Sequence, residues 1–302
     1  MDWIDGIKSS VDYIEEHLTD HIDYTEAASK CFLSVYHFQR VFSILFGFTV
    51  GEYIRNRRLT LAGAELATTD IKIIDAALKY GYESPDGFTK AFQKFHGILP
   101  SQVQKNEGRL ASFSRLSFEF SLKGGKNMDY RIEKKPSMVL TGYRTKFTGA
   151  PYGKERKTQE EKLFISTRGK QWFLKGVSGN DDAYCVISSI SDDGYDFSYC
   201  HLLGEWERNN LYNHAVTGVD FVEELMFENI TIPESTYVIF ETKDIKNTIS
   251  EYFDILNQRV QTLTEWMPEM GFRLAEGPEI MVYHWMPRTE RSVQIWMPIE
   301  KI

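Results

Sequence analysis

Apolar residues in the first third of the chain recur with the spacing of helices that bury one face. The first stripe places residues at i, i+3, i+4 and i+7 and consists of Phe38, Val41, Phe42 and Leu45. The second stripe has the same spacing fifty positions later and consists of Phe88, Ala91, Phe92 and Phe95. This periodicity predicts two amphipathic helices, each with a polar face opposite its apolar stripe.

The fifty-residue offset also relates the segments around these helices, which indicates an internal duplication. The ungapped matches are Ala27 with Ala77, Ser34 with Ser84, Phe38 with Phe88, Arg40 with Lys90, Phe42 with Phe92, and Gly47 with Gly97. Each copy has the end signals of two short helices and a turn. These signals are N-caps at Ser34 and Ser84, Pro85 at a first helical position, a turn glycine at Gly81, and terminating glycines at Gly47 and Gly97.

Two such copies, joined by a long helix expected from about Gly51 to Ala67, form a pair of helix-turn-helix units. A capped helix with one polar face fits the DNA major groove, and two rigidly joined helices can enter successive grooves about 34 Å apart. The alternative is two helical hairpins with solvated outer faces, since every amphipathic helix has a polar face. The duplication favours the DNA-binding interpretation.

The outward side chains of these helices are candidate DNA contacts. Arg40 can pair with guanine, Gln39 can pair with adenine, and Tyr36 can pack on a thymine methyl group. The further candidates are Ser34 and Ser84 for phosphate at the helix N-termini, and Lys90 and Asp86 for the second helix.

From residue 128 onward, strand and helix patterns occur twice in the same order, with an offset near 96. The first copy has a strand at 138–147, a helix at about 155–173, and strands near 184–190 and 195–203. The second has a strand at 235–242, a helix at about 247–266, and strands near 279–285 and 291–299. Two β-α-β-β repeats predict an α+β fold with an antiparallel sheet, helices on one face, and the other face free or enclosing a cleft.

The pattern between these two regions predicts a linker. Apolar and polar residues alternate here, with the apolar positions at Leu116, Phe118, Phe120 and Leu122. This alternation predicts a strand that docks on one of the two domains, before Gly124 and Gly125 break the chain. We therefore expect an all-α domain at 1–108, a linker with a strand at 109–127, and an α+β domain at 128–302.

Charge and composition limit the cellular locations and the binding partners that the sequence allows. The net charge of −8 disfavours strong non-specific DNA binding, yet residues 30–58 carry five basic side chains against one acidic one, a local +4. No apolar run approaches the roughly 20 residues of a membrane helix. The acidic amino terminus lacks the apolar run of a secretion signal. The three cysteines are sparse and odd in number, which disfavours a disulfide framework. We expect a cytoplasmic bacterial protein, nucleoid-associated when bound to DNA.

The sequence gives little support for a catalytic or metal-binding site. Cys185, Cys200 and His201 lack the paired spacing of a closed metal site. The chain has no G-x-S-x-G, Walker A or dinucleotide-binding pattern. We therefore expect no metal, no cofactor and no catalytic residue.

The segments SVYHFQRVFSILFGFTVGEYIRNRRLTLAGAEL and ALKYGYESPDGFTKAFQKFHGILPSQ, within residues 4–105, resemble the AraC/XylS family of transcription regulators. The resemblance implies that both recognition helices enter the major groove on one face of the DNA. The base-reading positions of the first helix are occupied by Tyr36, Gln39 and Arg40, and those of the second by Pro85, Asp86, Gly87 and Lys90.

The sequence departs from this family at several positions. Phe32 replaces the usual turn glycine of the first unit, and Val103 replaces an aromatic residue after Pro100. Because a bulky residue disfavours positive φ, we expect the first turn to differ in shape. Pro85 and Gly87 have little with which to read bases, so we expect the first unit to supply most sequence specificity and the second mainly backbone contacts.

Residues 128–302 resemble the GyrI-like (Rob-like) effector-binding domain, through IPESTYVIFET, TEWMPEMGFRLAEGPEIMVY and VQIWMPIE. The resemblance implies a cleft between the repeats for bulky, aromatic, frequently cationic compounds that pair with a buried acidic residue. Gln294 and Met281 stand where glutamates are frequent in that family. The charge partner is therefore elsewhere, at Glu241, Glu279 or Glu290, or the ligand is neutral; we expect a neutral or weakly polar aromatic effector.

Aromatic side chains in this half suit ligand stacking, although each also suits ordinary core packing. A period of two places Glu279, Met281, Tyr283 and Trp285 on one strand face, and likewise groups Gln294 with Trp296. The candidate ligand-binding residues are Tyr143, Trp172, Trp206, Tyr283, Trp285, Gln294 and Trp296.

The sequence thus predicts a DNA-binding regulator, not an enzyme, that senses a small hydrophobic or aromatic molecule and contacts RNA polymerase if it is an activator. One alternative is that the second half is a small hydrolase, as some similar domains are. Gln294 and Met281 disfavour it because neither accepts a proton as glutamate does. The other alternative is a module that binds a protein instead of a small molecule.

Overall fold

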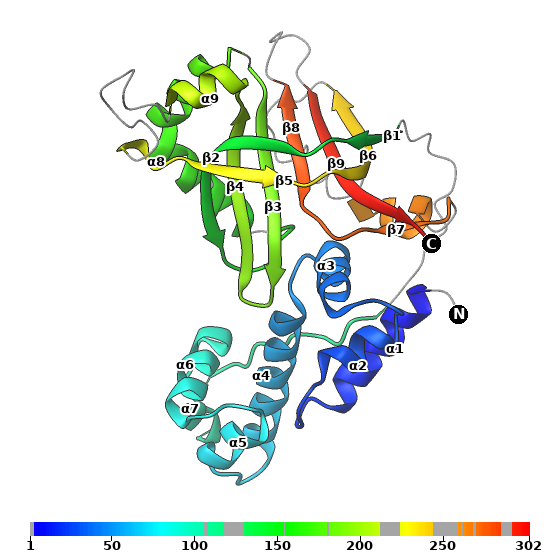
Figure 1. The fold of residues 1–302 in the computed structure, drawn as a ribbon. Helices are drawn as coiled ribbons and strands as arrows, with labels where there is room; N and C mark the ends of the chain where they lie inside the picture. Colours follow the sequence, from blue (N-terminus) through cyan, green and yellow to red (C-terminus); the bar gives the residue numbers. More distant parts are fainter. Residues whose placement is uncertain are drawn as a thin grey trace. The chain divides into compact units, whose positions relative to one another are not determined.

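A computed structural model gives the fold of the chain (Figure 1). The residues that it describes are 3–105, 108–117, 130–153, 155–179, 181–211, 224–243, 259–260, 262–267, 270–284 and 292–302. The chain divides into two compact units, one made of residues 1–42 and 49–123, the other of residues 43–48 and 124–302. None of the described helices is long and apolar enough to cross a membrane.

The first region is entirely helical, as the sequence predicts. Its helices are α1 (Trp3–Glu16), α2 (Tyr24–Ser29), α3 (Val35–Phe46), α4 (Val50–Thr68), α5 (Ile73–Lys79), α6 (Pro85–His96) and α7 (Pro100–Gln104). Helices α3 and α6 begin and end fifty residues apart, in agreement with the duplicated sequence. The long helix α4 connects the two copies (Figure 1).

The helix ends follow the capping signals of the sequence. Ser84 accepts a hydrogen bond from the Gly87 amide at 3.1 Å and caps α6, whose first residue is Pro85. Ser34 accepts from the His37 amide at 3.3 Å and opens α3 in the same way. The terminating residues Gly47 and Gly97 have φ of 74° and 76°, the left-handed conformation expected after a helix.

The turn of the first copy contradicts the expectation for Phe32. Despite its bulk, Phe32 has φ of 58°, close to the 78° of the turn glycine Gly81 in the second copy. Both turns also close with a similar backbone bond, from Leu33 N to Ala28 O at 3.1 Å in the first and from Tyr82 N to Ala77 O at 2.9 Å in the second. The first turn therefore keeps its shape and retains an unfavourable φ at Phe32.

One arginine of α4 holds both copies together. Arg58 donates hydrogen bonds to the carbonyl oxygens of Leu18 and Asp20, at 2.7 and 2.8 Å, in the segment between α1 and α2. Its guanidinium also covers Gly81, where an added Cβ would lie 2.3 Å from Nη1. A glycine at position 81 therefore serves two purposes, a positive φ and space for Arg58.

The described part of the linker, 108–117, packs on unit 1 without forming a strand, and residues 118–127 lie outside the described residues. Phe113 donates from its amide to Thr60 Oγ1 at 2.9 Å, and its carbonyl accepts from Arg57 Nη1 at 2.6 Å. Arg57 also pairs with Glu15 at 2.8 Å, and both side chains are nearly buried. No strand is assigned within residues 108–117, and the predicted strand beyond Ser117 lies outside the described residues, so the strand stays a prediction.

The second region is a mixed α/β unit with an antiparallel sheet, as predicted. Its strands are β1 (Tyr130–Lys135), β2 (Met138–Phe147), β3 (Ala183–Ser191), β4 (Gly194–Leu202), β5 (Glu228–Ile232), β6 (Ser235–Lys243), β7 (Phe272–Leu274), β8 (Glu279–His284) and β9 (Ser292–Lys301). Its helices are α8 (Glu155–Ser178), α9 (Glu205–Leu211) and the short π-helical turn η1 (Thr262–Trp266). Of the predicted helix 247–266, residues 247–258 and 261 lie outside the described residues.

The sheet closes on itself, so its inner face is neither free nor an open cleft. The strand order is β1-β6-β9-β8-β3-β4-β2-β5. Lys135 pairs with Ser235 and Met138 with Ile232, so β1–β2 and β5–β6 continue one antiparallel register across the front of the sheet (Figure 1). The two ends of the strand order thereby join, and the enclosed core consists of Leu140, Tyr184, Val186, Cys200, Ile230, Ile232, Tyr237, Ile239, Ile280, Val282 and Trp296.

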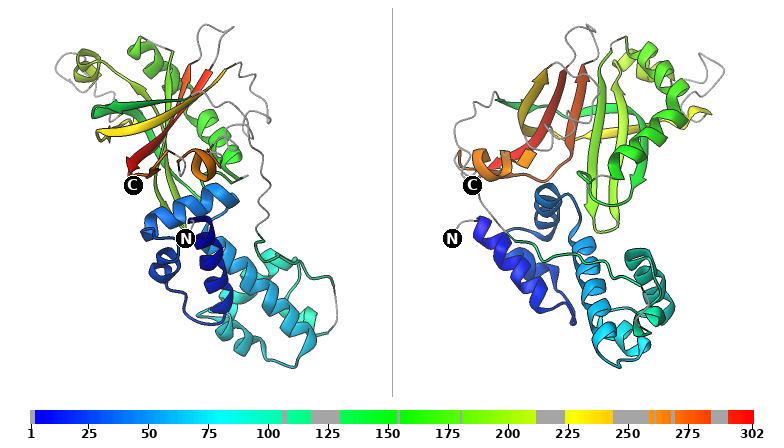
Figure 2. Two further views of the ribbon diagram at one scale, coloured as in Figure 1. Left: turned by 90° about the vertical axis from the view of Figure 1, so that its right-hand side faces the viewer. Right: turned by 180° about the vertical axis from the view of Figure 1, so that it is seen from behind.

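Helix α8 lies on the outer face of this sheet and contacts β2 and β4 (Figure 2). Some polar residues of this helix are buried, and some of its hydrophobic residues are exposed. The side turned to the sheet carries the buried Leu174 together with polar residues, of which Arg156 and Gln171 are 3% and 8% exposed. The opposite side carries Ile165 and Trp172, which are 78% and 68% exposed. Apolar packing of Leu174 on the sheet therefore accounts for only part of the buried side of this helix.

Candidate functional sites

Helix α6 presents a free polar face, as the sequence predicts. Phe88 and Phe92 are fully buried in the core of the second copy. The exposed side chains on the other side of the helix are Asp86, Lys90, Gln93 and Lys94, with Ser84, Pro85 and Gly87 exposed at its N-terminal end. These polar side chains therefore lie outside the buried apolar core of the second copy.

Helix α3 differs from α6 in its exposure. Tyr36 and Gln39 are partly buried, and Arg40 is fully buried at 0% exposure. Ser34, at the helix N-terminus, is exposed. In this structure Arg40 therefore has to leave its surroundings before it can reach a base. The DNA contacts proposed for both helices stay predictions.

Part of the basic stretch between residues 30 and 58 is engaged within the protein. Lys30 pairs with Glu26 at 3.3 Å. Burial raises the pKa of Glu15, but hydrogen bonds from Arg57 and Tyr53 outweigh it and hold that pKa below its usual value. The sequence did not reveal these contacts because Glu15 lies 42 residues from Arg57. This stretch is not a simple phosphate-binding surface.

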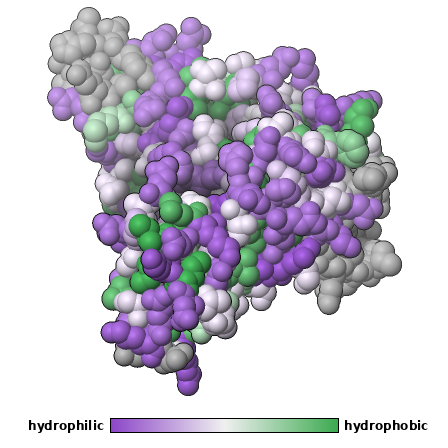
Figure 3. All heavy atoms as spheres, turned by 90° about the horizontal axis from the view of Figure 1, so that it is seen from below, coloured by the Kyte–Doolittle hydropathy of each residue, from purple (hydrophilic) through white to green (hydrophobic). Residues whose placement is uncertain are grey.

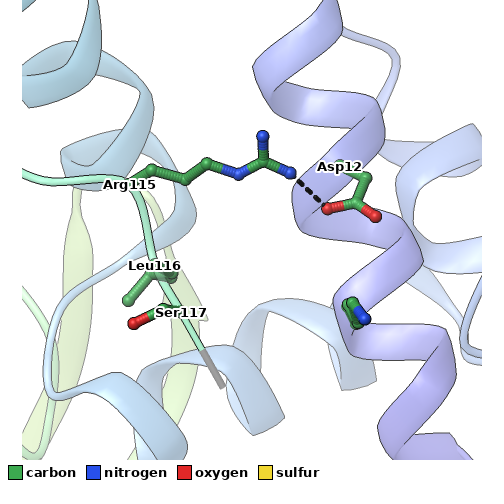
Figure 4. A pocket seen from close by; sticks show the side chains of 5 residues that line it. Asp12, Arg115, Leu116 and Ser117 are labelled. Atoms are coloured by element: carbon green, nitrogen blue, oxygen red, sulfur yellow. Dashed lines mark hydrogen bonds and ion pairs between the residues drawn. The ribbon is translucent and has the colours of Figure 1, made fainter. Parts of the chain in front are cut away.

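A shallow hollow of about 320 Å³ lies between α1 and the docked linker in unit 1 (Figure 4). Its lining consists of Lys8, Asp12, Arg115, Leu116 and Ser117. Arg115 reaches across it to Asp12 at 2.5 Å, and both side chains are about half exposed. An exposed pair of this kind contributes little energy, and the hollow holds no residue predicted to bind a ligand.

Among the described residues of unit 1, the exposed large hydrophobic side chains are Phe32, Ile74, Leu78 and Leu110. Ile74 and Leu78, one turn apart on α5, are 50% and 62% exposed, and Phe32 is 72% exposed. Seen from below, the surface shows small hydrophobic areas among polar side chains (Figure 3). Exposed apolar groups of this size are common on soluble proteins and specify no partner.

In unit 2 the structure does not bring the predicted ligand residues together. Val282 of β8 pairs with Gln294 of β9, which places Met281 and Tyr283 on the opposite sheet face from Gln294 and Trp296. Trp296 faces the enclosed core, where its Nε1 donates to Gln294 Oε1 at 3.0 Å.

The remaining candidates are also dispersed. Tyr143 packs in an apolar cluster with Leu174 and Phe227. Trp172 and Trp206 are exposed on α8 and α9, at 68% and 73%. Trp285 and Glu290 lie outside the described residues. A ligand-binding role for this set stays a prediction.

A layer of buried polar groups lies between α8 and the outer sheet face. Arg156 pairs with Glu160 at 2.6 Å and donates to Met281 Sδ at 3.4 Å. Burial lowers the pKa of Arg156, but the Glu160 carboxylate outweighs it and holds that pKa well above its ordinary value. Gln171 donates to Thr167 one turn earlier in the same layer. The pair places two opposite charges beside the sheet and leaves the layer neutral.

A second buried pair lies beside the first. Glu279, 1% exposed, accepts a hydrogen bond from Arg259 and another from Tyr152 at 2.5 Å. The Arg259 guanidinium lies 5.0 Å from the centre of the Tyr152 ring. Glu279 is one of the acids considered as charge partners, and the structure gives it a cation from the chain itself.

Three further titratable groups of this face are held neutral. Burial raises the pKa of the Cys185 thiol and of the Tyr283 hydroxyl above their ordinary values. Burial lowers the pKa of His201 to about 4, and its Nδ1 lies 2.8 Å from the Asp182 carbonyl oxygen. Because both arginines have carboxylate partners and these groups are uncharged, the layer has no surplus charge.

Sequence reasoning missed most of this polar layer. Arg156, Glu160 and Gln171 read as the solvated side of an amphipathic helix, because charged residues usually face water. A signal was available in the helix itself. Gly169, Trp172 and Gly176 fall together on the side opposite to Arg156 and Gln171. The sequence pattern alone does not decide which of these two sides is buried, because that depends on the elements packed against the helix.

Comparison with known proteins gives the relation of unit 1. A family described as a helix-turn-helix domain matches residues 27–106. The HTH-type transcriptional activator AarP of Providencia stuartii is 42% identical over 89 residues, which are 30% of this chain and 66% of AarP, somewhat less than two thirds of that relative. The regulatory protein SoxS of Salmonella typhimurium is 37% identical over 98 residues, 32% of this chain and 92% of SoxS.

A solved structure of SAV2435 bound to tetraphenylphosphonium aligns with 57% of this chain and 94% of its own, with a TM-score of 0.38 and 15% identity. SoxS, by contrast, is matched over nearly its whole length at an identity well above chance. The matched residues are those that form the two copies α2–α3 and α5–α6 and the connecting helix α4. The chain therefore belongs to the AraC family of helix-turn-helix transcription regulators.

Proposed function

We propose that this protein regulates transcription by binding specific DNA through α3 and α6, the second helices of two helix-turn-helix units. The exposed polar face of α6 carries the proposal, because it is held by a capped, well-packed helix and serves no purpose in the core. The contacts proposed for α6 are Ser84, Pro85, Asp86, Gly87 and Lys90. Those proposed for α3 are Ser34, Tyr36, Gln39 and Arg40.

A measurement of DNA affinity against salt concentration tests this part of the proposal. We expect Lys90→Ala to lower the affinity for every sequence and to reduce the salt dependence by about one phosphate contact. Replacement of Arg40 by alanine is expected to reduce discrimination between operators instead. Equal weakening for all DNA by Arg40→Ala assigns Arg40 to phosphate, and no effect of either variant contradicts the proposal.

We also propose that unit 2 binds a neutral aromatic effector against the polar layer of Arg156, Gln171, Met281 and Tyr283. Hydrogen-bonding groups beside aromatic and thioether surfaces are typical of small-molecule sites. Because Arg156 and Arg259 already have carboxylate partners, a cationic ligand would find no unpaired acid here.

Thermal shifts with two probes of similar shape test the charge preference. Triphenylphosphine oxide is neutral and tetraphenylphosphonium is a cation. We expect the neutral probe to raise the Tm more, and Gln171→Leu to abolish that rise by removing a polar contact. A larger rise with the cation contradicts the neutral ligand, and no response to a broad aromatic panel contradicts sensing as a whole.

A further inference from the structure

The outward side of α8 carries two exposed hydrophobic side chains. Ile165 and Trp172 are 78% and 68% exposed, and both lie on this one helix. They are seven residues apart, so they lie on one line along the helix, two turns from each other. The guanidinium of Arg168 lies 5.5 Å from the Trp172 ring centre, which fixes the indole without covering it.

Two glycines lie on the same line, at Gly169 and Gly176. A glycine inside a helix costs about 1 kcal/mol relative to alanine, so its presence calls for a reason. The part of the chain that the structure describes offers none, because a Cβ added at either position would have nothing within 4 Å. Along this line large and small residues therefore alternate, in the order Ile165, Gly169, Trp172, Gly176.

Such an alternating line is complementary to itself when read in the opposite direction. In an antiparallel pair of α8 helices, Ile165 faces Gly176 of the second copy while Trp172 faces its Gly169. Each large side chain then packs over a glycine of the second copy. Because the pair has twofold symmetry, each of these contacts is made twice.

We propose that this side of α8, the line formed by Ile165, Gly169, Trp172 and Gly176, is a docking surface for a second copy of this chain. The contact joins two α8 helices antiparallel about a twofold axis. One helix pair buries less than the ~1,200 Å² of a standard stable interface, so the dimer is expected to form at about micromolar concentration or above.

Sedimentation velocity of the full chain over a range of concentrations tests the proposal. The wild type is expected to show a concentration-dependent dimer. Gly169→Leu combined with Gly176→Leu fills the hollows without an internal clash and should reduce association at least tenfold. Trp206→Ala, which removes an equally exposed tryptophan from α9, should leave association unchanged. A wild-type chain that stays monomeric at several hundred micromolar, or a double variant that dimerises as well as the wild type, overturns the proposal.

Unchanged far-ultraviolet circular dichroism and an equal or higher Tm will show that the double variant is folded, since leucine favours helix over glycine. Disulfide trapping then tests the register. A chain with Ile165→Cys mixed with a chain with Gly176→Cys should form the cross-linked heterodimer in high yield. Cross-linking of Ile165→Cys to itself in equal yield contradicts antiparallel pairing.

Discussion

At the scale of single residues, Phe32 shows how tertiary structure overrides a local preference. The turn between α2 and α3 requires φ of 58° at this position, and the phenyl ring gains little burial in return because it is 72% exposed. A left-handed conformation costs an L-residue about 1–2 kcal/mol. The surrounding helices therefore determine the turn, and the residue tolerates it.

Phe32→Gly is expected to stabilise unit 1 by about 0.5–1 kcal/mol, because relief of the positive φ exceeds the added flexibility of the unfolded chain. Urea unfolding followed by circular dichroism measures the change. Phe32→Ala is the matched control, since it removes the ring but keeps a Cβ at positive φ. Equal stabilisation by alanine would mean that exposure of the ring, and not the backbone, is unfavourable.

His201 predicts a dependence of stability on pH. Its folded pKa of about 4 is below the unfolded value near 6.5, so its neutral form contributes stability above pH 6.5 that is lost as the pH falls towards 4. The loss should amount to about 2–3 kcal/mol by pH 4. Asn in place of His201 keeps a hydrogen-bond donor without titrating. Denaturant unfolding should show a smaller loss for His201→Asn, and an unchanged loss contradicts this assignment.

At the scale of elements, most boundaries were predictable and most side-chain environments were not. The predicted strand 138–147 agrees with β2, and α3 and α6 agree with the fifty-residue duplication. Periodicity and capping depend on neighbours in sequence, which explains this success. The orientation of α8 depends on β2 and β4, and the engagement of Arg57 depends on Glu15, so neither was accessible from local pattern.

The Glu15–Arg57 pair predicts a strong coupling between α1, α4 and the docked linker. Arg57→Met leaves a nearly buried carboxylate without its cation and should destabilise unit 1 by about 2–4 kcal/mol. Glu15→Gln added to Arg57→Met should recover much of that loss. A double-mutant cycle by urea unfolding measures the coupling, and additive effects of the two substitutions would contradict it.

At the scale of the whole molecule, each unit has a packed core and, apart from it, side chains whose placement core packing does not explain. In unit 1 these side chains form the polar face of α6. In unit 2 the closed sheet already has its own core, and the polar layer under α8 and the hydrophobic line outside it remain to be explained. The sequence predicted the first of these surfaces through the duplication. It did not predict the others, because they depend on which side of α8 faces the sheet.

Hydroxyl-radical footprinting of the full chain on its operator tests the central proposal, that two helix-turn-helix units bind DNA together. We expect two protected regions on one face of the duplex, one helical turn or about 34 Å apart. Lys90→Ala combined with Gln93→Ala should weaken one region and leave the other. A single protected groove, or equal loss of both regions with the fold intact, would contradict binding by two separate units.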